Sequence, residues 1–170
     1  MPSRAEIARL ADELLAQAGV TEPAVPIEEV ARAAGFRIVK ERLESDLSGF
    51  YVMRGDTPTI GVNVWHSRVR QRFTIAHELG HATLQADEHY DREFRRDPNS
   101  SMATDPDEID ANAFAAALLM PADWIKARWA DATDLLDNEW VVRTAKEFGV
   151  STQSLIYRID NLGLLRGGTG

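Results

Sequence analysis

The chain has no cysteine among its 170 residues. Disulfide bonds and thiolate metal sites are therefore excluded, and a metal ion would have to be held by histidine, carboxylate and water. Histidine is also scarce, with only four residues in the whole chain. Because there is no long apolar run, the sequence predicts neither a signal peptide nor a membrane span, and we expect a cytoplasmic protein.

The charge balance is acidic, with a formal net charge of −8. This argues against direct binding to DNA over a broad surface, because nucleic acid attracts basic proteins. The hydrophobic and charged fractions, 44% and 27%, are ordinary for a soluble globular protein. The length is most simply that of one domain with a core of its own.

Two of the four histidines fall in one apolar stretch, residues 73–84 (FTIAHELGHATL). The H-E-x-x-H spacing places His77 and His81 on one face of a helix, where both imidazoles can bind the same zinc ion. Two imidazoles leave room for a third ligand and a water, and Glu78 can take a proton from that water. Gly80 inside the helix predicts close approach of another element, since glycine there costs about 1 kcal/mol against alanine.

The same pattern also occurs by chance on solvated helices. The apolar surroundings argue against that interpretation, because these polar side chains would then be buried without a purpose. His66, at a strand-to-helix junction, is interpreted as a surface residue. Three arginines precede the H-E-x-x-H motif, namely Arg68, Arg70 and Arg72. We expect them to face solvent or to pair with carboxylates.

Residues 105–121 predict a second buried helix, which begins at Asp105. Glu108 is either the third metal ligand or the second half of a capping box with Asp105. The residues alone prefer the ligand role only modestly, because two other carboxylates compete for it, Asp107 and Asp110. Asn112 lies four residues after Glu108 on the same face and could hydrogen-bond one of the ligand histidines.

The pattern of residues 36–42, 48–53 and 59–64 predicts three strands. We expect an α+β fold: a small three-stranded antiparallel sheet on the H-E-x-x-H helix, with N-terminal helices and the glutamate-bearing helix. Gly61 and Asn63 are candidates for an edge strand that pairs with an extended peptide, although a hidden edge is equally compatible with the sequence.

Residues 140–159 predict a pair of helices similar to a helix-turn-helix. Only Gln153 and Arg158 suit base recognition and Asp160 opposes them, so we favour a structural pair over a DNA-reading one. The polar stretch 87–107 predicts a surface loop. The alternative is a flap in which Tyr90 or His89 donates to an oxyanion.

Two segments, residues 72–81 (RFTIAHELGH) and 108–121 (EIDANAFAAALLMP), resemble the ImmA/IrrE family of metallo-endopeptidases. The resemblance extends over residues 5–165 and implies that Glu108 is the third zinc ligand. A similarity to gluzincin peptidases implies that Asn112 supports a ligand histidine. The family further implies a zinc-dependent endopeptidase, with Glu78 as the catalytic residue and an intracellular helix-turn-helix repressor as substrate. Such genes often accompany phage, mobile-element or toxin–antitoxin modules.

These observations predict a single metallopeptidase domain over residues 1–170. We expect a catalytic core at 5–120, a helical subdomain at 121–165 and a disordered end at 166–170. One Zn²⁺ per chain is expected, although the same ligands suit Mn²⁺ or Fe²⁺.

The main alternative is a non-catalytic regulator, associated with a toxin–antitoxin system, that binds a repressor or DNA and has a structural metal. A zinc hydrolase for a non-peptide amide is a lesser alternative. Glu78 distinguishes a peptidase from a non-catalytic regulator, because a structural metal site has no use for a carboxylate beside the water. The sequence identifies neither the substrate nor the oligomeric state.

Overall fold

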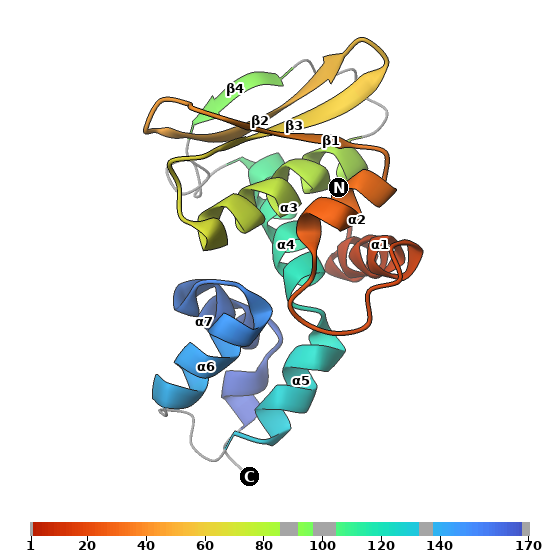
Figure 1. The fold of residues 1–170 in the computed structure, drawn as a ribbon. Coiled ribbons are helices and arrows are strands. Elements are labelled where there is room, and N and C mark those ends of the chain that lie inside the picture. The colour runs from red at the N-terminus through yellow and green to blue at the C-terminus, as the bar shows by residue number, and fades with distance from the viewer. Residues whose placement is uncertain (1, 86–91, 97–104, 133–137, 168–170) are drawn as a thin grey trace.

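The computed structural model describes residues 2–85, 92–96, 105–132 and 138–167 (Figure 1). Its helices are α1 (Arg4–Gln17), α2 (Ile27–Ala33), α3 (Arg68–Leu84), α4 (Pro106–Leu119), α5 (Ala122–Ala130), α6 (Asn138–Phe148), α7 (Thr152–Asn161) and the 3-10 helix η1 (Leu164–Gly167). Its strands are β1 (Arg37–Glu41), β2 (Leu47–Arg54), β3 (Thr57–Asn63) and β4 (Arg92–Arg96). Figure 1 shows the sheet lying across α3, with α5, α6 and α7 at the opposite end of the molecule.

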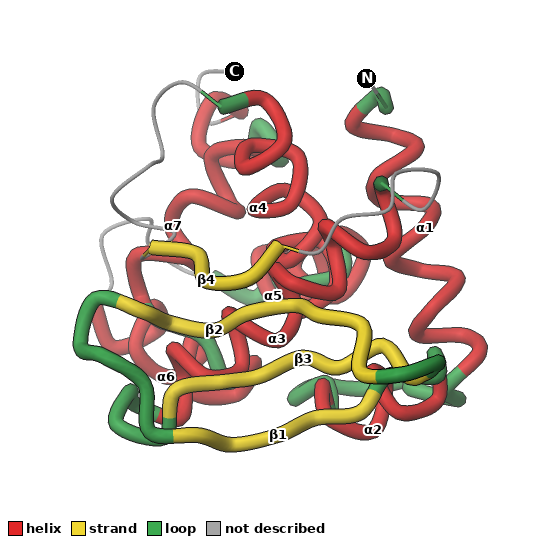
Figure 2. The backbone as a smooth tube through the Cα atoms, turned by 90° about the horizontal axis from the view of Figure 1, so that it is seen from above, coloured by secondary structure: helices red, strands yellow, loops and turns green. Residues whose placement is uncertain are grey.

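The strands form one mixed sheet in the order β1-β3-β2-β4 (Figure 2). β2 and β3 form an antiparallel hairpin, whose turn contains Gly55 at a φ of 65°. β1 runs parallel to β3, with Ile38 opposite Ile60, and β4 pairs antiparallel with β2. The predicted α+β class is confirmed. The expectation of a purely antiparallel, three-stranded sheet is wrong, because β1 is parallel and β4 adds a fourth strand in a stretch predicted as loop.

The prediction that Gly61 and Asn63 lie on an edge strand is also wrong, because β3 pairs with a strand on each side. The buried amide of Asn63 donates to the carbonyl of Leu47 at 2.8 Å and accepts from the backbone N–H of Trp65 at 3.1 Å. A Cβ at Gly61 would lie 2.1 Å from Cζ of Phe50. Both residues therefore serve packing inside the sheet and the loop that precedes β2.

The centre of the molecule is the pair α3 and α4. Ser67 caps α3 by accepting from the backbone N–H of Arg70, and every residue from 74 to 81 is buried. A Cβ at Gly80 would lie 3.0 Å from Cδ1 of Phe114 and 3.2 Å from the carbonyl of Ala111. The predicted close approach at Gly80 is confirmed, and the helix that approaches it is α4. Apolar side chains from both ends of the chain join this pair in one core.

The C-terminal pair, α6 and α7, is present as predicted and turns at Gly149, where φ is 66°. Two arginines connect this pair to the central helices. Nε of Arg72 on α3 donates to the carbonyl of Gly149 at 3.0 Å, and Nε of Arg158 on α7 donates to the carbonyl of Met120 at 2.9 Å. The prediction that Arg72 faces solvent or pairs with a carboxylate is therefore wrong.

Three further predictions concern the C-terminal end, the flap and a membrane span. Residues 166 and 167, predicted to be disordered, belong to η1, whereas 168–170 lie outside the described residues. His89 and Tyr90, the residues of the predicted flap, lie outside them as well. Within the described ranges, no helix combines the length and the apolar character needed to cross a membrane.

Candidate metal centre

The contact between α3 and α4 brings His77, His81 and Glu108 together. Their exposed fractions are only 1%, 3% and 7%. The two Nε2 atoms of the histidines are 3.0 Å apart. The Glu108 oxygens lie 3.2 Å from Nε2 of His77 and 3.3 Å from Nε2 of His81. Two imidazole nitrogens and one carboxylate thus converge on a single buried point, and this group could bind a metal ion.

The donor set fits a tetrahedral divalent cation. Bonds of about 2.0–2.1 Å to nitrogen and oxygen place neighbouring ligand atoms about 3.3 Å apart in a tetrahedron. The two Nε2 atoms are 3.0 Å apart, and each lies at a similar distance from one Glu108 oxygen, 3.2 Å to Oε2 for His77 and 3.3 Å to Oε1 for His81. Lone pairs this close repel each other unless a proton or a cation lies between them. The arrangement is therefore suited to a cation, and three protein ligands leave a fourth position for water.

Asn112 fixes the orientation of the first histidine. Its Oδ1 lies 2.9 Å from Nδ1 of His77. With the amide oxygen facing the ring, Nδ1 carries the proton and donates it, so Nε2 presents its lone pair to the centre. Burial lowers the pKa of His77, against the opposing effects of the Glu78 charge and the Asn112 hydrogen bond. The neutral imidazole that a metal ion requires is therefore the favoured form.

The residue that caps α4 is Asp105, and Glu108 instead faces the two histidines. The carboxylate of Asp105 accepts from the backbone N–H of Asp107 at 3.0 Å, and this bond caps the helix. Glu108 directs its two oxygens at the two histidines. The competing carboxylates, Asp107 and Asp110, lie outside the metal-competent group.

Glu78 is the other buried carboxylate of the site, with 2% of its surface exposed. It follows His77 on α3, and its charge acts on that imidazole. Burying a carboxylate is costly unless a partner or a chemical task compensates for it. The site thus combines three convergent ligands with a further carboxylate on the same helix.

Two other residues with rings are His66, just before α3, and Phe73, within it. His66 lies outside the ligand group, and its Nε2 is 3.3 Å from the carbonyl of Ser45. Phe73 stacks against His77, with ring centroids 6.4 Å apart and planes at 30°. Phe73 lies four residues before His77, which places both side chains on one face of α3.

A family model described as Peptidase_M78, the IrrE N-terminal-like domain, matches residues 31–160. The chain belongs to this family. The match spans both helices of the buried group, α3 and α4, and confirms the resemblance to the ImmA/IrrE peptidases. It also supports a metallopeptidase type of site at the buried group His77, His81 and Glu108.

The chain also resembles two individual proteins. The chain is 27% identical over 110 residues to a protein of Bacillus phage phi105 named "Uncharacterized immunity region protein 2", covering 65% of this chain and 67% of the relative. Among solved structures, a Mycobacterium tuberculosis transcriptional regulator shares the fold, with a TM-score of 0.64 at 21% identity. That similarity covers 91% of this chain but only 46% of the regulator, so the chain spans less than half of the regulator's length.

Proposed function

We propose that the chain is a zinc-dependent endopeptidase that hydrolyses a peptide bond in an intracellular helix-turn-helix repressor. The observation that carries this proposal is the burial of Glu78 beside the convergent ligands His77, His81 and Glu108. A structural metal site needs the ligands alone. A second buried carboxylate next to them is the group that a peptidase needs as its base.

In this proposal His77, His81 and Glu108 hold the ion, one per chain. Zn²⁺, when bound, supplies Lewis acidity toward the scissile carbonyl and toward a water molecule. Glu78 accepts the proton of the attacking water and then delivers it to the leaving amine. Asn112 keeps the His77 ring in the orientation and tautomer that expose Nε2.

The names of two relatives support a substrate connected with repression. The phage protein is named for an immunity region, and the protein with the similar fold is named a transcriptional regulator. The family assignment of this chain adds a peptidase-type site to that connection. A cytoplasmic repressor, encoded beside this gene, is therefore the first substrate to examine.

The rival function is a non-catalytic regulator in which the same three ligands hold a structural metal. The test compares the wild type with Glu78→Gln, which keeps the size of the side chain and removes the base. Zinc content is measured by mass spectrometry, and cleavage of the neighbouring repressor is followed by gel and peptide mapping. His66→Gln is the matched control, because His66 lies outside the ligand group.

We expect all three proteins to bind one zinc ion per chain. Cleavage should fall by about 10²–10⁴-fold in Glu78→Gln, the usual contribution of a general base, and should persist in His66→Gln. If the zinc-loaded wild type cleaves no repressor encoded beside it, the regulator is the correct function. Equal cleavage by wild type and Glu78→Gln would also overturn the proposal.

A further inference from the structure

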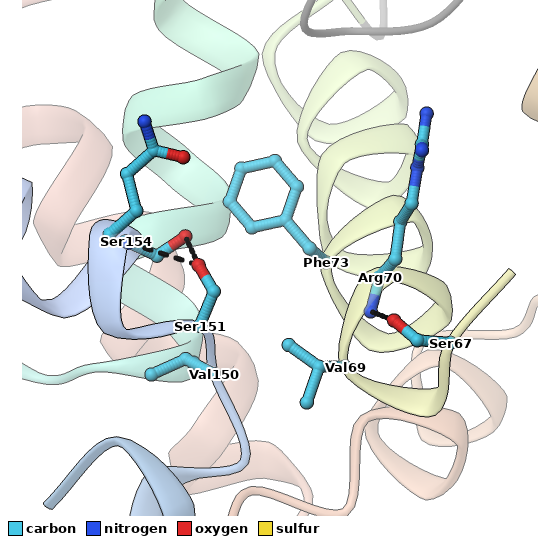
Figure 3. A pocket seen from close by; sticks show the side chains of 8 residues that line it. Ser67, Val69, Arg70, Phe73, Val150, Ser151 and Ser154 are labelled. Carbon is cyan, nitrogen blue, oxygen red and sulfur yellow. Dashed lines mark hydrogen bonds between the residues drawn. The ribbon is translucent and has the colours of Figure 1, made fainter. Parts of the chain in front are cut away.

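A cavity of about 230 Å³ lies between the first turns of α3 and the start of α7 (Figure 3). Val69 and Phe73 line it from α3, and Val150 and Ser154 line it from the α6–α7 turn and α7. Figure 3 shows Phe73 projecting from α3 into the space between the two helices. An apolar cavity of about 150 Å³ already accommodates benzene, so this one has room for a leucine or phenylalanine side chain.

The cavity continues the face of α3 that carries the metal ligands. Residues spaced by three or four positions share one helix face, and Arg70, Phe73, His77 and His81 follow that spacing. Phe73 belongs to both sites, because its ring lines the cavity and stacks against His77. At 1.5 Å per helical residue, Phe73 and Val69 lie about 6 and 12 Å along α3 from His77, which corresponds to about two to four residues of extended peptide.

Polar side chains also line the cavity: Ser67, Arg70, Ser151 and Ser154 make hydrogen bonds within the protein, and the exposed Gln153 lines it as well. The hydroxyl of Ser151 donates to that of Ser154 at 2.8 Å and accepts from the backbone N–H of Ser154 at 3.0 Å. The guanidinium of Arg70 donates to Ser48 on β2 at 3.1 Å, and Figure 3 shows its side chain directed along α3, away from Ser151. The side chains of Val69, Phe73 and Val150 form the apolar wall that a bulky apolar group would contact, and Gln153 adds an amide at the edge of that wall.

We propose that this cavity is a specificity subsite of the peptidase, which receives a bulky apolar side chain of the substrate near the scissile bond. The inference rests on the proposed function, since it assigns the occupant to the same polypeptide that is hydrolysed. Phe73 is a specificity-determining residue in this arrangement, because it forms the wall between the subsite and the ligand His77. The cavity selects the residue, and the metal centre cleaves the bond.

The test uses the zinc-loaded full chain and the repressor that it cleaves. Once the cleavage site is mapped, substrate positions about two to four residues from the scissile bond are changed one at a time to Leu, Phe and Gly. The cavity is filled by Val69→Phe from one wall and, independently, by Ser154→Leu from the other. Val142→Phe is the matched control, because Val142 is 58% exposed on α6 and does not line the cavity.

At one substrate position, we expect the wild type to have a kcat/KM about 10-fold or more higher for Leu or Phe than for Gly. Both filled variants should lose this preference and keep their zinc content, while Val142→Phe retains it. If Val69→Phe fails to fold, the same loss in Ser154→Leu supports the subsite.

Three results would overturn the subsite: no apolar preference in the wild type, a preference that survives in the filled variants, or an equal loss in Val142→Phe. In each of these cases cleavage itself persists, so the proposed endopeptidase stands. Absence of all cleavage by the wild type would overturn both the endopeptidase and its subsite, and the two failures are thus distinguishable.

Discussion

The amide oxygen of Asn112 lies 2.9 Å from Nδ1 of His77 and thereby sets the tautomer of that histidine. The two residues come from different helices, α4 and α3, and their contact depends on the close approach at Gly80. Because Nδ1 donates to the amide, Nε2 is left with its lone pair facing Glu108. One hydrogen bond between the helices therefore favours the form of His77 in which Nε2 could bind a metal ion.

Replacement of Asn112 by Ala should weaken metal binding without removing a ligand. Loss of the partner that orients a ligand histidine typically costs about 10–100-fold in metal affinity. We expect that decrease in Asn112→Ala, measured by competition with a chromogenic zinc chelator. Asn138→Ala is the control, because Asn138 is an exposed asparagine at the start of α6. Equal zinc affinity in both variants would show that the bond to His77 has no role in binding.

Glu108→Gln should abolish the stabilisation that zinc gives to the fold. A ligand that binds only the native state at about 100 times its Kd contributes about 2.7 kcal/mol, which corresponds to a Tm higher by about 5–10 °C in a protein of this size. We expect EDTA to lower the Tm of the wild type by that amount and to leave Glu108→Gln almost unaffected.

The control for that experiment is Asp107→Asn, which changes the neighbouring carboxylate in the same turn and leaves the ligand group intact. Its Tm should respond to EDTA as the wild type does, and re-addition of zinc should restore both. The ligand assignment fails if Glu108→Gln retains the full response, or if Asp107→Asn loses it.

The metal-free protein should become less stable as the pH falls below about 6.5, the ordinary pKa of histidine. Burial lowers the pKa of His77 in the folded state, so the unfolded chain takes up its proton first. Each such proton reduces the free energy of unfolding by at most about 1.4 kcal/mol per pH unit, between pH 6.5 and the lower folded-state pKa.

Urea unfolding in the presence of a chelator between pH 7.5 and 5.5 measures this effect. The same series on His77→Gln should show a shallower dependence on pH, because that variant cannot take up the proton. An unchanged slope in His77→Gln would mean that another group is responsible.

The helices that carry His77, His81 and Glu108 were predictable from the sequence because their signals are local. The four-residue spacing of His77 and His81 fixes one helix face, and Asp105 marks the start of α4. Gly80 indicated that another element approaches α3, but no local signal identified Phe114 and Ala111 as its contacts. The hairpin of β2 and β3 was also predictable, since its turn lies within the short segment between two strands.

The pairing of distant strands was not predictable from such signals. The parallel register of Ile38 with Ile60 joins strands that are separated by the whole of β2, and nothing in either strand specifies that order. β4 (REFRR) lacks the alternation of a half-buried strand, and only its pairing with β2 defines it. The same limit explains why Asn63 was assigned to an edge, since its buried hydrogen bonds are to a loop about sixteen to twenty residues earlier.

Arg72 shows how a signal present in the sequence can be misread. It precedes Ile75, Ala76 and Leu79 on the buried side of α3, so the apolar periodicity already places it against the core. Its charge favoured an exposed position in sequence reasoning. In the structure the guanidinium caps the end of α6 by donating to the carbonyls of Gly149 and Phe148 at 3.0 and 3.4 Å.

Arg72→Met should therefore destabilise the attachment of the C-terminal pair. The change keeps the aliphatic part of the side chain but leaves two carbonyls without their donor, which costs about 1–3 kcal/mol for buried groups. Arg68→Met is the matched control, because Arg68 lies one turn earlier on α3 and is exposed. We expect the free energy of unfolding of Arg68→Met to change by less than about 0.5 kcal/mol.

Hydrogen exchange should become faster in α6 and α7 of Arg72→Met only. If both variants lose the same stability, or if exchange in α6 and α7 stays at the wild-type rate, then Arg72 does not hold the pair against α3.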